Sequence, residues 1–299
     1  MIRTPGPWGS DQRKAGVAIG VFDGVHLGHQ QILRQTIADA RACGGLAVAV
    51  TFDCHPNSIV APERTPPLIY SLPKKLRMLE ASGIDVTRLI HFDQAFSGIS
   101  AEQFVRDLMV EAGSIASICV GEGFTFGYRR QGNVELLRTM GVAVHAVADV
   151  ALDGVTVSST RVRQAIRDGD LEVAGRLLGR RYTLSGNVVR GAQLGRKLGF
   201  PTANLDVTGI LTPPLGVYAA EAVHGGKTHR AAVNIGHRPT INPQEKKTFV
   251  EAHLLDFNGE LYDQELELSF LRKLRDEIKF PTLEALKEQV ARDIAEARK

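Results

Sequence analysis

Residues 16–41 decide the fold of the first half of the chain, and they read GVAIGVFDGVHLGHQQILRQTIADAR. Residues 16–22 are apolar or glycine and predict a buried strand, and residues 23–28 hold two glycines, which predict a turn. From residue 29 to residue 41 the apolar side chains return with helical spacing. A buried strand that turns through glycine into a helix indicates the start of a βαβ unit.

The alternation of strands and helices continues to residue 147. Strands are predicted at residues 46–52, 86–92, 115–120 and 142–147, and helices at residues 74–82 and 101–113. This alternation predicts an α/β fold with a parallel sheet that is covered on both faces. Ligands of such sheets bind beyond the carboxyl ends of the strands, so the turn at residues 23–29 is expected at a binding edge.

The pattern changes after residue 181. A short helix is predicted at residues 170–178, with Gly179 as its C-cap. Short alternating runs then follow, at residues 182–190, 216–223, 229–235, 248–257 and 264–270. These runs are typical of an antiparallel barrel or sandwich, and an amphipathic helix is predicted at residues 282–298. We therefore expect two domains, 1–181 and 182–299, the second being an antiparallel β-barrel with a terminal helix.

Composition and charge are those of an ordinary globular protein. The chain has 299 residues, 43% of them hydrophobic and 23% charged, which excludes a largely disordered chain. The net charge of +3 gives no support for a nucleic-acid or membrane partner. Three cysteines without a CxxC pair favour a reducing cytoplasm, and we expect neither a signal peptide nor a membrane-spanning segment. The sequence leaves open whether the chain forms a homo-oligomer.

Two histidines three residues apart, His26 and His29, make the turn after the first strand a candidate phosphate site. Glycine lets the backbone approach a phosphate closely, and the N-terminus of the following helix offers free N–H groups. The two imidazoles can donate hydrogen bonds to phosphoryl oxygens, and phosphoryl-type transfer depends mostly on such positioning. A zinc site that recruits Cys54 and His55 is the alternative, but no second pair has metal-ligand spacing.

A second phosphate-binding pattern lies at residues 158–163. Ser158, Ser159 and Thr160 are N-cap residue types just before a helical stretch, and Arg163 can neutralise phosphate charge. A simple helix cap with a solvated arginine is the alternative. Together with the histidine turn, the pattern favours a site for a triphosphate.

The histidine turn resembles the HxGH signature of the nucleotidyltransferase superfamily. More narrowly, it resembles the GxFDGVHxGHQ stretch of the FMN adenylyltransferase module in bacterial bifunctional riboflavin kinase/FAD synthetases. TFDCHP at residues 51–56, VGEGFTFG at 120–127 and VSSTRVR at 157–163 resemble further motifs of that module. The resemblance implies a Rossmann-like nucleotidyltransferase domain in which His26, His29 and Arg163 are catalytic. It also implies flavin contacts by Phe124 and Phe126, and ATP contacts by Gly20, Phe22, Asp23, Gly24, Gly28, Ser158, Ser159, Thr160 and Arg161.

One position departs from that family. Gly123 stands where relatives often carry Asp or Asn close to the bound nucleotide or flavin. The missing side chain keeps two alternatives open. One is a flavin- or nucleotide-binding regulator, and the other is a riboflavin kinase with an impaired adenylyltransferase half.

Residues 186–205 form a glycine-rich, basic stretch in the second domain. The stretch reads as a loop whose N–H groups can wrap phosphates while Arg196 and Lys197 supply charge, although it lacks the Walker A pattern. Thr202 and Asn204 are hard oxygen donors two residues apart, so on an extended segment both can reach Mg²⁺. The alternative is a surface hairpin with ordinary turn glycines.

The same stretch closely resembles the GRxLGFPTAN signature of the riboflavin kinase module, matched here at residues 195–204. PLGVYA at 214–219, NIGHRPT at 234–240 and VEAHLLDF at 250–257 resemble its other motifs. The resemblance implies that Thr202 and Asn204 hold Mg²⁺, and that Glu251 is the general base for the 5′-hydroxyl of riboflavin. It implies that ATP contacts Gly191, Gly195, Arg196, Lys197, Gly199, Pro201, Thr202 and Asn204.

Two of these residues have structural alternatives. Glu251 is a surface carboxylate on an edge strand in the simpler interpretation. Arg275 matches the family's LRxExKF segment, which implies a place beside the flavin pocket, but an ion pair with Asp276 or Glu277 on a helix surface explains it equally simply.

The whole resemblance implies a bifunctional enzyme with two ATP sites. One half would phosphorylate riboflavin to FMN with Mg²⁺ and ATP. The other half would transfer AMP from ATP to FMN, which gives FAD and pyrophosphate. A different HxGH nucleotidyltransferase with an unrelated barrel is the alternative, and the kinase motifs argue against it.

Overall fold

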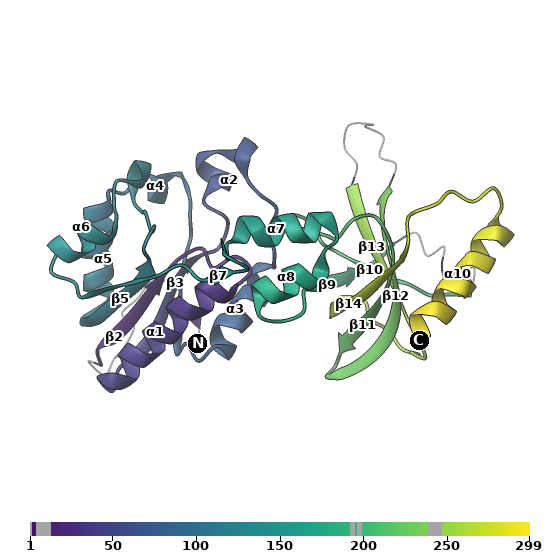
Figure 1. Cartoon of the computed structure of the whole chain (residues 1–299), viewed down its shortest axis with the longest axis horizontal. Helices are drawn as coiled ribbons and strands as arrows, with labels where there is room; N and C mark the ends of the chain where they lie inside the picture. Colours follow the sequence, from purple (N-terminus) through teal and green to yellow (C-terminus); the bar gives the residue numbers. More distant parts are fainter. Residues whose placement is uncertain (1, 4–12, 192–194, 196–198, 239–246) are drawn as a thin grey trace. The chain divides into compact units, whose positions relative to one another are not determined.

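The structure divides into two compact units (Figure 1). It is a computed structural model that describes residues 2–3, 13–191, 195, 199–238 and 247–299. The first unit is Met1–Arg161 and the second is Val162–Lys299, so the division falls within helix α7 (Ser159–Asp168). None of the helices in the described ranges combines the length and the apolar character of a membrane span.

A six-stranded sheet forms the centre of the first unit, and all neighbouring strands in it are parallel. The order is β1-β4-β3-β2-β5-β6, with β1 (Ile2–Arg3), β2 (Ala15–Ile19), β3 (Leu46–Phe52), β4 (Val86–Ile90), β5 (Ile115–Gly121) and β6 (Val144–Val147). The predicted α/β fold with a parallel sheet is confirmed. β2 ends at Ile19 rather than at residue 22, because Phe22 has a left-handed φ of 52°, which a strand does not allow.

Side chains of different size alternate along β2 and β3, and both faces of the sheet are buried. The larger side chains enter one hydrophobic core, which contains Val17, Ile19, Val48 and Val50. The smaller side chains enter the core on the other face, which contains Ala18, Ala47 and Ala49. The small residues let helix α1 (Leu27–Ala42) pack close to the sheet. A methyl group at Gly16 would lie 2.7 Å from the carbonyl oxygen of Thr36 in α1.

The connections between strands hold the remaining helices of this unit. They are α2 (Asn57–Val60), η1 (Pro62–Arg64), α3 (Leu72–Ala81), α4 (Gln94–Ser97), α5 (Ala101–Ala112), η2 (Tyr128–Arg130) and α6 (Val134–Thr139). A small hairpin, β7 (Ala151–Leu152) and β8 (Val155–Thr156), precedes α7. The predicted helices at 74–82 and 101–113 correspond to α3 and α5. The single-turn helices have no counterpart in the predictions, because one turn is too short to show a period.

The strand order places a switch point beside β2. From β2 the chain adds β3 and β4 on one side of the sheet, and then returns to add β5 and β6 on the other side. Ligands of open α/β sheets bind at the carboxyl ends of strands where the order reverses in this way. The segments that follow β2 and β5 therefore meet at the expected binding edge.

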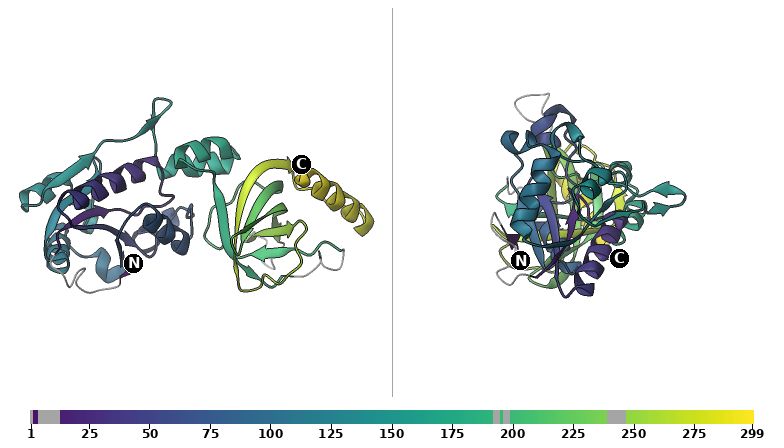
Figure 2. Two further views of the ribbon diagram at one scale, coloured as in Figure 1. Left: turned by 90° about the horizontal axis from the view of Figure 1, so that it is seen from below. Right: turned by 90° about the vertical axis from the view of Figure 1, so that its left-hand side faces the viewer.

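The second unit is built on a closed, antiparallel six-stranded barrel with the order β10-β13-β12-β11-β14-β9 (Figure 2). Its strands are β9 (Thr183–Val189), β10 (Ala203–Leu205), β11 (Gly216–His224), β12 (Lys227–Arg238), β13 (Lys247–Leu254) and β14 (Glu265–Arg275). Pairing of β9 with β10 closes the barrel. The predicted barrel is confirmed, although β10 lies in the stretch predicted as a loop.

The register of β13 separates an inner from an outer face. Val250 and Ala252 are 1% and 0% exposed, and their partners on β12, Ile235 and Val233, are fully buried as well. Side chains alternate between faces along a strand. Glu251, which lies between these two buried residues, therefore faces the outside of the barrel.

Two helices flank the barrel strands in sequence. Helix α8 (Leu171–Leu178) ends at Gly179, whose left-handed φ of 69° makes it the predicted C-cap. Helix α10 (Leu283–Arg298) begins after Thr282, which accepts the N–H of Ala285 at its hydroxyl. The predicted terminal helix is thus confirmed.

Candidate functional sites

The turn after β2 brings His26 and His29 face to face. Their rings stack with centroids 3.7 Å apart, and Nδ1 of His26 accepts the N–H of His29 over 3.4 Å as the N-cap of α1. With Nδ1 accepting, a neutral His26 carries its proton on Nε2 and can donate it to a ligand. His26 is 6% exposed and His29 is half-buried, and a methyl group at Gly28 would meet the His26 ring at 3.2 Å. Both predicted histidines thus lie at the positive end of the α1 dipole.

The backbone of this turn is strained and firmly held. Phe22, Gly24 and Val25 have φ values of 52°, 83° and 41°, and a β-branched residue such as Val25 rarely adopts a positive φ. The buried carboxylate of Asp23 accepts the N–H of Ile69 over 3.0 Å. Strain that surrounding structure fixes in place is common at ligand-binding sites. Asp23 therefore acts as an anchor for the turn.

A hydrogen bond joins the turn to the N-terminus of α7. Oγ of Ser159 donates to the carbonyl of Asp23 over 2.9 Å, and Oγ of Ser158 accepts the N–H of Arg161 over 3.2 Å. The structure therefore brings together the two segments that the sequence assigns to a triphosphate.

The two arginines of this motif have different surroundings. The guanidinium of Arg161 donates to the carbonyls of Leu152 and Val155, over 3.0 and 2.7 Å, and so supports the β7–β8 hairpin. Arg163 is 6% exposed on α7. The contacts of both arginines and of Thr160 with ATP stay predictions.

Phe124 and Phe126 follow β5 at the same edge of the sheet. Their rings stack with centroids 5.4 Å apart, and Phe126 also packs 5.8 Å from Phe104 in the hydrophobic core. Phe126 is thereby anchored, while Phe124 remains partly exposed at the end of this row of rings. Apart from Gly123 and its two chain neighbours, no described atom lies within 4 Å of the place where a side chain at Gly123 would begin. The flavin contacts of the two phenylalanines stay predictions.

Lys75 of α3 is a residue that the sequence analysis does not single out. Its ammonium donates to the carbonyls of Val21 and Phe52, over 3.1 and 2.8 Å, and to Oγ1 of Thr51 over 3.1 Å. Burial lowers the pKa of Lys75 to about 8, although the charge of Asp23 acts in the opposite direction. The lysine ties the turn after β2 to the carboxyl end of β3. Its sequence context carries no signal, because two adjacent lysines on a helix look like a solvated face.

Cys54 and His55 make local contacts instead of joining the histidine pair. Cys54 donates to the carbonyl of Phe92 over 3.5 Å, and Nδ1 of His55 accepts the N–H of Asn57 over 3.1 Å. Among the described residues, no group of three metal ligands contains either of them. The structure gives no support to the zinc alternative at this turn.

A row of polar residues crosses the outer face of the barrel. Glu251 of β13 pairs directly with Asn204 of β10 on one side and with Asn234 of β12 on the other. Directly opposite side chains point to the same face, with Cβ atoms about 4.5–5.5 Å apart. Asn204 is 7% exposed and Glu251 is half-buried. The predicted base and a predicted metal donor are therefore neighbours. Asn234, which the sequence analysis names only within the NIGHRPT motif, lies beside Glu251 as well.

Two glycines pack closely against the predicted metal donors. A methyl group at Gly191 would lie 2.5 Å from Oδ1 of Asn204. A methyl group at Gly195 would lie 3.1 Å from Oγ1 of Thr202 and 2.5 Å from the carbonyl oxygen of Phe200. Glycine is required at both positions because any side chain would displace the donor beside it.

His253 fixes the end of the glycine-rich stretch. Its Nδ1 lies 2.8 Å from the carbonyl oxygen of Pro201, and since a carbonyl only accepts, Nδ1 carries the proton. Gly199 has a φ of 90°, which favours glycine. Arg196 and Lys197 lie outside the described residues. The alternation along β13 places His253 on the same outer face as the predicted base.

A cleft of about 230 Å³ opens beside Thr202. Its lining includes Pro201, Thr202, Ala203 and residues 257–262. Its lining combines apolar residues, such as Val188, Leu254 and Phe257, with polar ones, such as Asn258 and Glu260, and ligand sites commonly combine the two. Glu251 and Asn204 are not among its lining residues.

The guanidinium of Arg275 binds a carboxylate of the terminal helix. Its Nη2 and Nε donate to Asp293 over 2.7 and 3.0 Å, and Gln289 donates to the same carboxylate. This pairing differs from the alternative, an ion pair with Asp276 or Glu277 on a helix surface, because Arg275 lies on β14 and meets Asp293 of α10. Arg275 therefore links α10 to β14. Its place beside a flavin pocket stays a prediction.

Comparison with known proteins matches both parts of the chain. The family model of FAD synthetase matches residues 9–161, and that of riboflavin kinase matches residues 178–299. A bifunctional riboflavin kinase/FMN adenylyltransferase from Pseudomonas fluorescens is 38% identical over 96% of this chain and 93% of its own length. One from Escherichia coli strain K12 is 36% identical over 94% of this chain and 91% of its own length.

A solved structure is also similar over the full length. It is described as a macrolide-efflux protein from Streptococcus pneumoniae, and it has a TM-score of 0.83 and 29% identity to this chain. The match covers 100% of this chain and 99% of that one.

Proposed function

We propose that this chain, which belongs to the family of bifunctional riboflavin kinase/FMN adenylyltransferases, phosphorylates riboflavin to FMN and then adenylylates FMN to FAD. The observation that carries the proposal is the presence of two separate groups of residues suited to ATP. In the first unit, the histidine turn is joined to the N-terminus of α7. In the second, Glu251 pairs with Asn204 beside a glycine-rich stretch.

In the kinase half, Glu251 would accept the proton of the riboflavin 5′-hydroxyl. Removing that proton makes the oxygen a better nucleophile towards the γ-phosphorus of ATP, and the remaining work is positioning and charge neutralisation. The cleft that Thr202 lines would take the adenine ring against its apolar residues. Thr202 lines that cleft, and its hydroxyl would meet the phosphates.

The donors beside Glu251 fit Mg²⁺. This ion prefers oxygen ligands, which the amide of Asn204 and the hydroxyl of Thr202 offer, and ATP phosphates usually complete its shell. The close packing of Gly191 and Gly195 against these two side chains limits their movement. When bound, Mg²⁺ would neutralise charge that develops on the transferred phosphoryl group.

In the adenylyltransferase half, FMN phosphate would attack the α-phosphorus of ATP, with pyrophosphate leaving. His26 and His29 would donate hydrogen bonds to the phosphates, Ser158, Ser159 and the N–H groups of α7 would bind the triphosphate, and Arg163 would neutralise its charge. Phe124, at the edge of the sheet beside β2, would contact the flavin ring. Direct transfer needs no covalent intermediate on the protein.

The proposal also covers domain limits and setting. We assign residues 1–181 to the adenylyltransferase and 182–299 to the kinase, with α7 and α8 leading from one to the other. We place the enzyme in the cytoplasm, acting on the small molecules riboflavin, FMN and ATP without a nucleic-acid or membrane partner.

The proposal is tested by incubating the purified chain with riboflavin, ATP and Mg²⁺ and separating the flavins by chromatography. We expect FMN to appear first and FAD to follow, with one pyrophosphate released for each FAD. Accumulation of FMN without FAD, even from supplied FMN, would indicate a kinase with an impaired second half. Binding of riboflavin without any product would indicate a regulator.

A further inference from the structure

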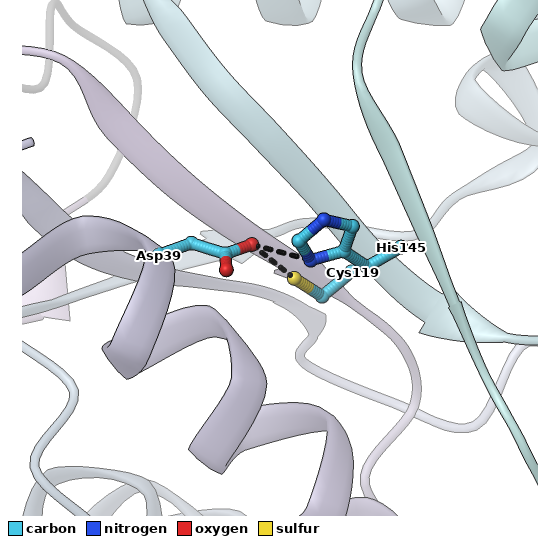
Figure 3. A group of neighbouring side chains, drawn as sticks. All are labelled: Asp39, Cys119 and His145. Carbon is cyan, nitrogen blue, oxygen red and sulfur yellow. Dashed lines mark hydrogen bonds and ion pairs between the residues drawn. The ribbon is translucent and has the colours of Figure 1, made fainter. Parts of the chain in front are cut away.

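Three side chains with metal-ligand chemistry converge in the first unit, outside the residues assigned to ATP. They are Asp39 of α1, Cys119 of β5 and His145 of β6 (Figure 3). Within the described ranges they are the one group of three such residues whose ligand atoms all lie within 4.8 Å of one another. Asp39 follows His29 by ten residues on α1, which is about 15 Å along the helix.

The three ligand atoms surround one point in space. Oδ2 of Asp39 lies 2.8 Å from Nδ1 of His145 and 3.3 Å from Sγ of Cys119, and Figure 3 shows both groups directed at this oxygen. Ligands of a tetrahedral zinc ion are about 3.3–3.7 Å apart, given metal–ligand distances of about 2.0–2.3 Å. The oxygen and the nitrogen therefore need to separate by less than about 1 Å to admit an ion.

A second layer of hydrogen bonds orients the carboxylate. Nε2 of Gln35 donates to Oδ1 of Asp39 over 2.7 Å, and Oγ of Ser117 donates to Oδ2 over 2.5 Å. Metal-binding carboxylates are usually held by such partners, which fix their direction. Both partners come from the elements that carry two of the ligands, α1 and β5.

The exposure of the three residues leaves one open side. Cys119 is fully buried and the side chain of Asp39 is 12% exposed, whereas the side chain of His145 is 48% exposed. An ion and a water ligand can enter past His145. A thiolate and a carboxylate together carry two negative charges, which a divalent cation balances in this half-buried place.

We propose that Asp39, Cys119 and His145 bind one Zn²⁺ ion, with water as the fourth ligand. Sulfur and imidazole ligands select zinc over Mg²⁺, so the site does not compete for the magnesium of the kinase. On binding, the Sγ–H proton of Cys119 leaves to solvent, and the proton of neutral His145 moves from Nδ1 to the exposed Nε2. The ion links the second half of α1 to β5 and β6, and so stabilises the helix that carries the two histidines at its other end.

The test uses the full-length protein without a histidine tag, treated with a chelator and kept free of nucleotide. Co²⁺ is added as a spectroscopic substitute, and we expect a thiolate-to-cobalt charge-transfer band that saturates at one Co²⁺ per chain and disappears on addition of Zn²⁺. We expect Zn²⁺ to raise the melting temperature. Cys119→Ser and His145→Gln should each weaken binding by about 100-fold or more, and Ser117→Ala by about 10-fold.

Cys54→Ser and Cys43→Ser are the matched controls and should leave the band unchanged. Because His145 is half exposed, His145→Gln keeps the test valid if Cys119→Ser does not fold. Absence of the band at saturating Co²⁺, or its persistence in both Cys119→Ser and His145→Gln, would show that the cluster is a hydrogen-bonded group that holds no metal. Loss of the band in Cys54→Ser alone would place the metal elsewhere and overturn the proposal.

Discussion

At the scale of single residues, the role proposed for Glu251 depends on its position in a strand. Its neighbours Val250 and Ala252 are buried in the barrel, and the alternation of the strand turns Glu251 to the face where Asn204 and Asn234 lie. The same residue on an unpaired surface strand would have no such fixed neighbours.

Glu251→Gln should separate the two reactions. The amide keeps the shape of the side chain but cannot accept a proton, so we expect FMN formation to fall by about 100-fold or more, while FAD formation from supplied FMN is unchanged. The matched control is Glu221→Gln on β11, which removes a carboxylate that pairs with Arg230 over 3.5 Å. Equal loss of both reactions in a folded Glu251→Gln protein would contradict the assignment.

Lys75 should make stability depend on pH. Its folded pKa of about 8 lies below the ordinary value of 10.5, so between these two values the folded state holds fewer protons than the unfolded state. The stability of the native protein should therefore rise with pH through this window. In Lys75→Met this contribution is absent.

The measurement is urea unfolding of both proteins at pH 8 and pH 9.5. We expect the difference in unfolding free energy, native minus variant, to grow by about 2 kcal/mol between these pH values. A difference that stays constant would show that the lysine has an ordinary pKa in the folded protein. FAD formation should also fall in the variant, because Lys75 holds the carbonyl of Val21 next to the histidine turn.

At the scale of elements, the approach of α1 to the sheet depends on Gly16. A methyl group there would lie 2.7 Å from the carbonyl of Thr36 and 3.1 Å from the nitrogen of Ala40, which are backbone atoms of α1 and cannot turn aside. Gly16→Ala should therefore lower the unfolding free energy by about 1–3 kcal/mol. It should also lower FAD formation, because α1 positions both histidines.

Gly123→Ala provides the matched comparison. Its position is exposed and open, with no described atom beyond its chain neighbours within 4 Å of the added carbon, so we expect no measurable loss of stability. The measurement is the unfolding free energy of Gly16→Ala and of Gly123→Ala, obtained by urea unfolding under the same conditions. Similar losses in both would mean that helix packing against β2 is not what makes Gly16 necessary.

At the scale of the whole molecule, the two units have separate cores. The sheet buries its side chains between its own helices, and the barrel buries an inner row of its own. A substitution in one site should therefore leave the other site intact. We also expect FMN made at one site to serve a second molecule of the protein.

A mixing experiment tests this independence. Neither His29→Ala nor Asn204→Ala alone should convert riboflavin to FAD, since each lacks one of the two steps. Mixed in equal amounts with ATP and Mg²⁺, they should form FAD after a lag, because FMN released by the first variant reaches the second. If the wild-type protein makes FAD and the mixture does not, FMN is never released and this expectation is wrong.

The sequence by itself determined the elements and the local chemistry. The apolar runs that form β2 and β3, the glycine turn, the C-cap at Gly179 and the ordered motifs of both halves are properties of adjacent residues, so they can be read before any folding is known. The inner and outer faces of β13 can also be assigned from the sequence, because the alternation of side chains along a strand involves only adjacent residues. For this reason the α/β unit, the barrel and most predicted site residues could be named from sequence.

Only the tertiary structure decided which distant residues meet. Lys75 reaches Val21, Ser159 reaches Asp23, and Arg275 pairs with Asp293 instead of a near neighbour. Asp39, Cys119 and His145 come together from one helix and two strands. Such meetings depend on strand register and on how closely helices pack. Strand register and helix packing depend on contacts throughout a whole unit, so they cannot be predicted from a short stretch of sequence.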